Sequence, residues 1–119
     1  MGPRVPFVTK ARAEPGNRGQ SLLHTSQMPA FVYILTSNHG TLYTGCTDDL
    51  HRRVFEHRNG IHSRFASKYG CHRLAWFEEC ATLQTAYARE QQIKGWTRAR
   101  KLALIQQINP EYRDLAEGW

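Results

Sequence analysis

The sequence lacks the features that mark membrane and secreted proteins. It contains no stretch approaching the roughly 20 consecutive apolar residues of a membrane-spanning helix, which excludes an integral membrane protein. Residues 1–30 contain no apolar run of the signal-peptide type, so we expect no export. The three cysteines form no Cys-x-x-Cys pair, which argues against a disulfide framework and a structural zinc site. We therefore expect a protein of the reducing cytoplasm with no membrane partner.

The length and charge indicate one small, basic domain. A chain of 119 residues accommodates a single core, and 40% hydrophobic residues are enough to build it. The net charge of +6 favours a polyanionic partner such as nucleic acid. Much of this charge lies in residues 51–101, where eleven Lys or Arg accompany four Asp or Glu. Part of it is equally well explained as a solvated helix face.

The chain divides into a leader and a domain. Residues 1–29 are rich in proline and glycine and show no hydrophobic period, so we expect a flexible leader. This leader is either the product of a misassigned start, in which case Met28 is the natural first residue, or a tail. An organelle presequence is the remaining alternative, although the proline content disfavours an amphipathic helix. Residues 30–119 form the predicted domain.

The domain alternates strand and helix patterns. FVYILTS and TLYTG flank the turn sequence SNHG and predict a β-hairpin, and HRLAWFEEC predicts a third strand. Helices are predicted over DDLHRRVFEHRNG, over TLQTAYAREQQIKGW with Thr82 as its cap, and over TRARKLALIQQIN before Pro110. SRFASKYG reads as a short helical or irregular connector. The expected fold is α/β of the α+β type, with a small, mostly antiparallel three-stranded sheet flanked by helices.

One carboxylate lies where the helical period calls for an apolar residue. The spacing of Leu83, Ala86, Tyr87 and Ile93 predicts the buried stripe of their helix, and Glu90 lies on the same stripe. Charged groups are seldom buried without a partner. Glu90 therefore requires either an ion pair with a nearby Arg or Lys, or a metal ion.

A second helix carries a similar anomaly. Leu50 and Val54 define its inward edge, and Arg53 and His57 share that edge at helical spacing. They are either an exposed pair or groups that face the helix of Glu90 across a cleft above the sheet.

The hairpin contributes two phenols, Tyr33 and Tyr43. They oppose each other on one face if a three-residue loop, residues 37–39, is followed by a left-handed Gly40. A loop with an even number of residues separates them onto opposite faces. Alone, two strand tyrosines are ordinary core or surface aromatics.

The combined pattern resembles a known family. FVYILTSNHGTLYTGCTDDLHRRVFEH is similar to the opening of the GIY-YIG nuclease superfamily, with FVY at the GIY position and YTG at the YIG position. AREQQIKGWTRARKLALIQQINPEYRDL is similar to the second half of the small stand-alone bacterial members. The resemblance spans residues 31–115. Phe31, Val32 and Thr44 depart from the family pattern, which affects packing more than chemistry.

The resemblance implies a catalytic centre of five residues. Glu90 is expected to be the only side chain holding one Mg²⁺ (or Mn²⁺), with water and phosphate oxygens completing the coordination. Arg53 is expected to stabilise the transition state, and Tyr33 to activate water with His57 as its relay. A phenol has a pKa of about 10, so Tyr33 needs the cations of Arg53 and the metal nearby. Tyr43 is expected to orient water or substrate.

Four further residues are expected to bind substrate. Gly45 would allow close backbone approach, and Lys68 and Tyr69 would touch phosphate or sugar. Asn109 resembles a family asparagine near the site, although a helix C-cap before Pro110 explains it equally well.

The expected function is that of a metal-dependent DNA endonuclease. With no further domain to give specificity, it would be structure-directed, directed at single strands, or dependent on a protein partner in DNA repair or processing. One alternative is a nucleic-acid-binding module with little or no turnover. The other is a protein-interaction adaptor whose basic surface is incidental.

Overall fold

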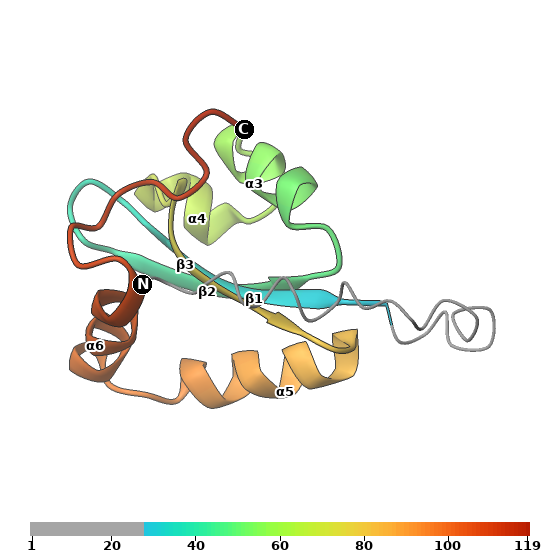
Figure 1. The fold of residues 1–119 in the computed structure, drawn as a ribbon. Coiled ribbons are helices and arrows are strands. Elements are labelled where there is room, and N and C mark those ends of the chain that lie inside the picture. The colour runs from blue at the N-terminus through green and yellow to red at the C-terminus, as the bar shows by residue number, and fades with distance from the viewer. Residues whose placement is uncertain (1–27) are drawn as a thin grey trace.

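The computed structural model describes residues 28–119, which form a three-stranded antiparallel sheet with helices on both faces (Figure 1). The central strand β1 (Ala30–Thr36) pairs with β2 (Leu42–Thr47) on one side and with β3 (Arg73–Cys80) on the other. The predicted α+β class and the three strands are confirmed. The predicted leader, apart from its last two residues, lies outside the described residues.

Four helices complete the domain, and their limits follow local sequence signals. Side-chain oxygens of Asp49, Ser63, Thr82 and Thr97 accept backbone N–H groups at the four N-termini, which satisfies donors that have no partner inside the helix. The predicted Thr82 cap is confirmed, and the connector SRFASKYG contains a short helix. The helices are α3 (Leu50–Arg58), α4 (Arg64–Tyr69), α5 (Leu83–Lys94) and α6 (Arg98–Ile108).

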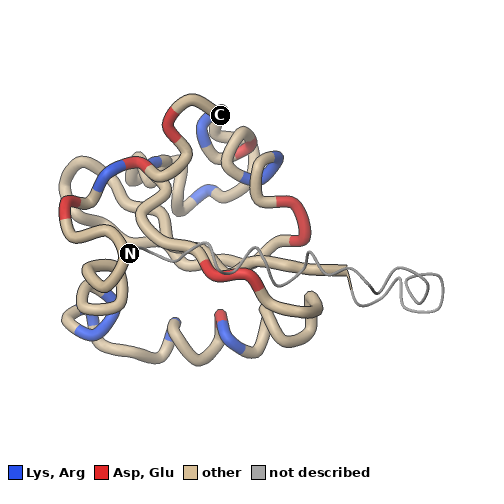
Figure 2. Tube along the Cα trace, in the orientation of Figure 1, with Lys and Arg blue, Asp and Glu red and all other residues tan. Residues whose placement is uncertain are grey.

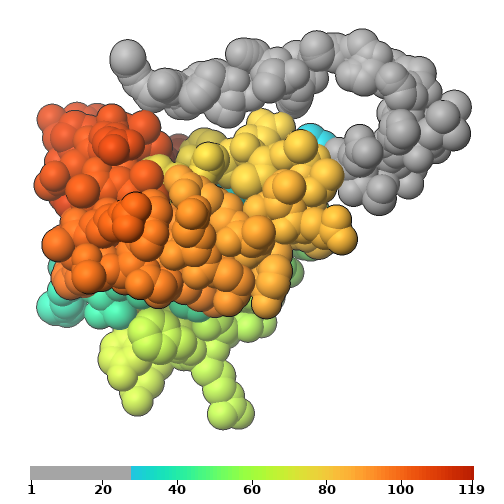
Figure 3. Space-filling model, turned by 90° about the horizontal axis from the view of Figure 1, so that it is seen from below, coloured from blue at the N-terminus to red at the C-terminus, as the bar shows by residue number. Residues whose placement is uncertain are grey.

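The central strand separates two apolar clusters. Val32 and Ile34 pack on the side of α5 and α6, whereas Tyr33 and Leu35 point to the side of α3 and α4, as the alternation of a strand requires. Figure 1 shows these helix pairs on opposite faces of the sheet, and Figure 3 shows α5 and α6 covering one face. Both faces of β1 are therefore buried.

The basic residues do not gather on one face. Lysines and arginines occur on all four helices and therefore on both sides of the sheet (Figure 2). Within the described residues, no helix has the length and apolar character needed to cross a membrane.

The two outer edges of the sheet differ. At the edge of β3, the C-terminal segment adds hydrogen bonds: Leu115 N donates to Leu74 O over 2.7 Å, and Leu74 N donates to Asp114 Oδ1 over 3.1 Å. Asn109 Nδ2 reaches the same strand and donates to Ala75 O over 3.0 Å. At the other edge, no further strand of the described chain pairs with β2.

The hairpin register differs from the predicted one. Tyr33 lies opposite Gly45, and Leu35 lies opposite Tyr43, because the loop comprises five residues, 37–41. Direct opposition of the two tyrosines is therefore wrong. They still share a face because the offset is two residues along the strand. Gly40 has a φ of +89°, so the left-handed glycine expected in the loop is confirmed.

Gly45 provides the space in which Tyr33 lies. A Cβ atom at Gly45 would stand 2.5 Å from the Tyr33 hydroxyl oxygen and 2.7 Å from its Cζ atom. Tyr33 is fully buried, so its rigid ring has no free volume into which it can retreat. The missing side chain at Gly45 is thus a packing requirement of the phenol.

We predict that Gly45→Ala lowers the free energy of unfolding by about 1–3 kcal/mol, the usual cost of overpacking. Gly95→Ala is the control, since its Cβ would meet nothing closer than 3.6 Å. Thermal unfolding followed by circular dichroism measures both variants. Equal stability of Gly45→Ala and the wild type would contradict the close packing of Tyr33.

Candidate active site at the edge of the sheet

Arg53 and Glu90 approach strand β2 from opposite faces of the sheet. Arg53 belongs to α3 and Glu90 to α5, so the expectation that both helices overlook one sheet face is wrong (Figure 1). Both reach Cys46 because β2 is an outer strand, which side chains from either layer can approach. Arg53 Nη1 donates to Cys46 O over 3.2 Å. Burial and the neighbouring Glu90 carboxylate raise the pKa of the Cys46 thiol to about 11.

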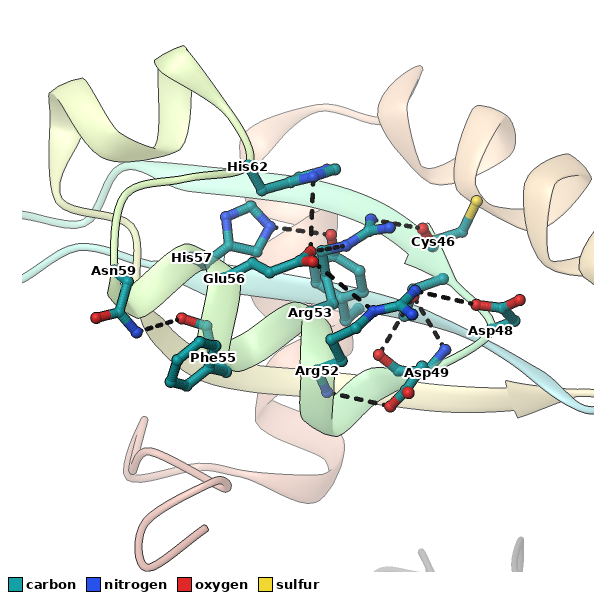
Figure 4. Close-up of polar contacts among 12 residues, drawn as sticks. Cys46, Asp48, Asp49, Arg52, Arg53, Phe55, Glu56, His57, Asn59 and His62 are labelled. Atoms are coloured by element: carbon teal, nitrogen blue, oxygen red, sulfur yellow. Dashed lines mark hydrogen bonds and ion pairs between the residues drawn. The ribbon is translucent and has the colours of Figure 1, made fainter.

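Arg53 is held in place by hydrogen bonds to α3 and β2, and it also lies within hydrogen-bonding range of the Tyr33 hydroxyl. Besides the bond to Cys46 O, its Nε donates to Glu56 Oε1 over 3.0 Å (Figure 4). Its side chain is 18% exposed, so the guanidinium is largely shielded yet reachable. Glu56 also lies 3.9 Å from His62 Nδ1. Glu56 is not among the residues predicted from the sequence, although its spacing of three residues from Arg53 on one helix is a usable signal.

Tyr33 and His57 form a buried, neutral pair. The Tyr33 hydroxyl lies 3.1 Å from His57 Nε2. Burial raises the pKa of Tyr33 well above its usual value, and Arg53 opposes this shift without overcoming it. Burial, together with His62 and Arg53, lowers the pKa of His57 to about 4. Arg53 alone therefore does not make Tyr33 a phenolate at neutral pH.

A row of aromatic rings leads from this pair to the surface. The Tyr43 ring lies 5.1 Å from that of His57 and 6.2 Å from that of Phe65, centroid to centroid. Phe65 in turn lies 4.8 Å from Tyr69, and Lys68 Nζ lies 5.3 Å from the Tyr69 centroid. Tyr43 is half-buried, whereas α4 exposes Phe65 and Tyr69. Phe65 was not predicted as a site residue, because the connector that contains it shows no clear hydrophobic period.

Glu90 is buried, as its position in the helical period predicts. Its residue surface is 7% exposed, and Ala86 and Ile93 on the same stripe are fully buried. Leu83 and Tyr87, however, are 46% and 57% exposed, so their assignment to the inward stripe is wrong. At about 100° per residue, Leu83 lies about 60° and Tyr87 about 100° around the helix from Ala86, on the side towards solvent.

The partner of Glu90 is Lys94, one helical turn further on. Lys94 Nζ lies 2.9 Å from Glu90 Oε2, and the carboxylate raises the pKa of Lys94. The ion-pair alternative left open by the sequence is therefore realised. The Lys94 side chain is 47% exposed, so its amino group can leave for solvent without disturbing the core.

The donor set at Glu90 fits a divalent cation held by one carboxylate. Within residues 28–119, no three His, Cys, Asp or Glu side chains form a metal-binding cluster. Mg²⁺ commonly takes one or two carboxylates and completes its shell with water and phosphate oxygens. Glu90 meets that requirement, provided that Lys94 releases it.

The remaining predicted residues occupy different places. The space beside Gly45 is filled by the Tyr33 ring, as described above. Asn109 lies at the β3 edge, where its amide bonds Ala75 O, Arg113 O and Arg113 N over 2.8–3.0 Å. The helix C-cap alternative for Asn109 agrees with its position directly after α6. Asn109 thus ties the end of α6 to β3 and to the segment that follows it.

A groove of about 580 Å³ adjoins Arg53. Its walls come from the end of β2, the turn that follows it, α3 and the first two turns of α5. The residues lining it are Cys46, Thr47, Asp48, Arg53, Leu83, Gln84 and Tyr87. The candidate site is thus open to solvent on the side of α5.

Known proteins share this sequence pattern. The family model of the GIY-YIG catalytic domain matches residues 29–103. A UPF0213 protein of Staphylococcus epidermidis is 39% identical over 77 residues, covering 65% of this chain and 94% of the relative. A UPF0213 protein of Syntrophus aciditrophicus is 41% identical over 85 residues, covering 68% and 93%. The solution NMR structure of a UPF0213 protein from Bacillus halodurans has a TM-score of 0.49 and 27% identity, covering 76% and 97%.

We predict that His57 makes stability depend on pH. Its folded pKa of about 4 lies below its ordinary value of 6.5, so the unfolded chain takes up the proton first. The free energy of unfolding should fall by up to about 3 kcal/mol as pH drops from 6.5 towards 4. Urea unfolding at several pH values measures this. His57→Gln should flatten the slope and the exposed His72→Gln should keep it; an unchanged slope in His57→Gln would contradict the assignment.

Proposed function

Since the chain belongs to the GIY-YIG nuclease family, we propose that it is a divalent-metal-dependent endonuclease that hydrolyses phosphodiester bonds in DNA. The observation that carries this proposal is that Arg53 and Glu90 both reach Cys46 on the outer strand β2, Arg53 through a hydrogen bond to the carbonyl oxygen and Glu90 beside the thiol. A buried carboxylate and a reachable guanidinium are the two charges that phosphodiester hydrolysis requires, one for the metal and one for the phosphate.

Glu90 is the residue that would hold Mg²⁺ or Mn²⁺. An ion held there would supply Lewis-acid polarisation of the phosphate and would neutralise charge on the leaving oxygen. Arg53 supplies hydrogen bonds to the phosphate oxygens, whose charge increases in the transition state. Because Glu56 and Cys46 already orient the guanidinium, little reorganisation is needed when substrate binds.

Tyr43, Tyr33 and His57 form the proposed path for the proton of the attacking water. Tyr43 is the more exposed phenol and would orient the water, whereas Tyr33 is fully buried behind it. The Tyr33 hydroxyl would receive the proton while passing its own to His57 Nε2, 3.1 Å away. Such a relay needs a neutral imidazole whose Nε2 carries no proton, and the lowered pKa of His57 favours the neutral ring.

The surface beside this centre would bind the DNA strand. Lys68 and Tyr69 are exposed on α4 and continue the aromatic row from Tyr43, a placement that suits contact with phosphate and sugar. We propose a role in DNA repair or processing in the cytoplasm, with a protein partner supplying target specificity.

A second candidate function is nucleic-acid binding with little turnover. Two observations favour it: Lys94 occupies the Glu90 carboxylate, and Tyr33 has no exposure to solvent. Both would slow catalysis unless substrate or metal rearranges the site. Measurement of turnover separates the two functions.

We predict that Arg53→Ala and Glu90→Gln each reduce Mg²⁺-dependent cleavage by about 100-fold or more. The assay measures initial rates on branched, single-stranded and supercoiled DNA. Arg113→Ala and Glu111→Gln are matched controls, since these two residues pair with each other at the surface and are both more than half exposed. Equal residual cleavage in Arg53→Ala and Arg113→Ala would contradict the proposed role of Arg53.

We further predict that Lys94→Gln increases the affinity for Mn²⁺ by about 2- to 5-fold, because an exposed ion pair that competes for the carboxylate contributes up to about 1 kcal/mol. Electron paramagnetic resonance measures free Mn²⁺ directly, without DNA. Lys68→Gln removes an equal charge elsewhere and serves as the control. Equal affinities in both variants would show that Lys94 does not compete for Glu90.

A further inference from the structure

Two apolar side chains on α5 are exposed beside the candidate site. Leu83 and Tyr87 are 46% and 57% exposed, and both line the groove that contains Arg53. Burying them against the sheet would remove apolar area from water, yet the helix turns them outward. The exposed Phe55 on α3 offers a contrast, because it does not line this groove.

The groove combines three kinds of chemistry within one small space. Arg53 supplies a cation on one wall, and Leu83 and Tyr87 supply an apolar and aromatic wall facing it. Asp48, whose side chain is 61% exposed, supplies hydrogen-bond acceptors at a third point. A purely apolar ligand would make no use of the two charges, and a bare anion would make no use of the ring.

A nucleotide carries the complementary groups. Its phosphate matches Arg53, whose guanidinium has five N–H donors and retains some beyond those engaged by Glu56 and Cys46. Its base has an aromatic face suited to stacking on tyrosine. Its exocyclic amino groups are donors for a carboxylate such as that of Asp48. The groove volume of about 580 Å³ lies within the range of small-ligand sites.

We propose that this groove is a nucleotide subsite, in which Tyr87 stacks on the base adjoining the phosphate held by Arg53. The proposal rests on the proposed nuclease function and adds a substrate-binding residue to it. Tyr87 lies one helical turn before Glu90, so the stacked nucleotide enters the site along α5. Asp48 is paired with Arg52 over 3.7 Å at the surface and can exchange this weak contact for the base.

Binding in the absence of divalent ions tests the subsite. The probe is a fluorescein-labelled 12-nucleotide single-stranded DNA in buffer with EDTA, followed by fluorescence anisotropy at low salt. Tyr87→Ala should weaken binding by about 5- to 150-fold, the range of base–aromatic stacking. Tyr87→Phe keeps the ring and should bind like the wild type. Phe55→Ala, which removes an exposed ring outside the groove, should also leave binding unchanged.

An oligonucleotide series with one abasic position provides the second arm. The wild type should lose affinity when the abasic position coincides with the stacked base, and Tyr87→Ala should show no further loss there. Wild-type affinity in Tyr87→Ala, or equal losses in Tyr87→Ala and Phe55→Ala, would overturn the subsite. So would a wild-type protein that does not bind the probe.

These results are independent of turnover. If Tyr87→Ala weakens binding while the wild type cleaves no DNA, the subsite stands and the endonuclease proposal fails. If the wild type cleaves DNA and Tyr87→Ala binds and cleaves equally well, the subsite fails and the endonuclease proposal stands.

Discussion

The packing of the Tyr33 ring over the backbone of Gly45 is the contact on which the site depends. It requires a residue without a Cβ on β2, directly opposite the phenol, and so fixes the register of the hairpin. With the ring in that position, its hydroxyl reaches His57 on α3. The same helix then directs Arg53 towards the edge of β2, where Cys46 O receives it. The close packing of Tyr33 on Gly45 thus positions β2, α3 and the guanidinium of Arg53 relative to one another.

Sequence patterns predicted the elements well because their signals are local. The hairpin, the third strand, the Thr82 cap and the stop before Pro110 each depend on a few neighbouring residues. The two-residue offset of Tyr43 could not be predicted, since it follows from a five-residue loop. The placement of α3 and α5 on opposite faces of the sheet could not be predicted either. Periodicity shows which side of a helix is buried, but it does not show which face of the sheet the helix covers.

The charges of the candidate site are compensated within the protein. Arg53 is paired with Glu56, and Glu90 is paired with Lys94, so neither main charge is unpaired in the free protein. The two pairs differ in exposure: the Arg53 side chain is 18% exposed, and that of Lys94 is 47% exposed. The guanidinium is therefore fixed, whereas the ammonium is exchangeable. Sequence reasoning identified Glu90 as needing a partner but had no means to choose between lysine and metal.

The unequal edges of the sheet explain where such a site can form. At β3, the C-terminal segment covers the edge with hydrogen bonds from Leu115 and Asn109, a common protection against unwanted strand pairing. At β2, the protection comes from side chains, with Arg53 bonded to Cys46 O. A side chain fixed at an edge can still offer its remaining N–H groups to a ligand, whereas a covering segment would have to unfold first. The edge protected by Arg53 is therefore the one at which a phosphate can bind while the protein keeps its own contacts.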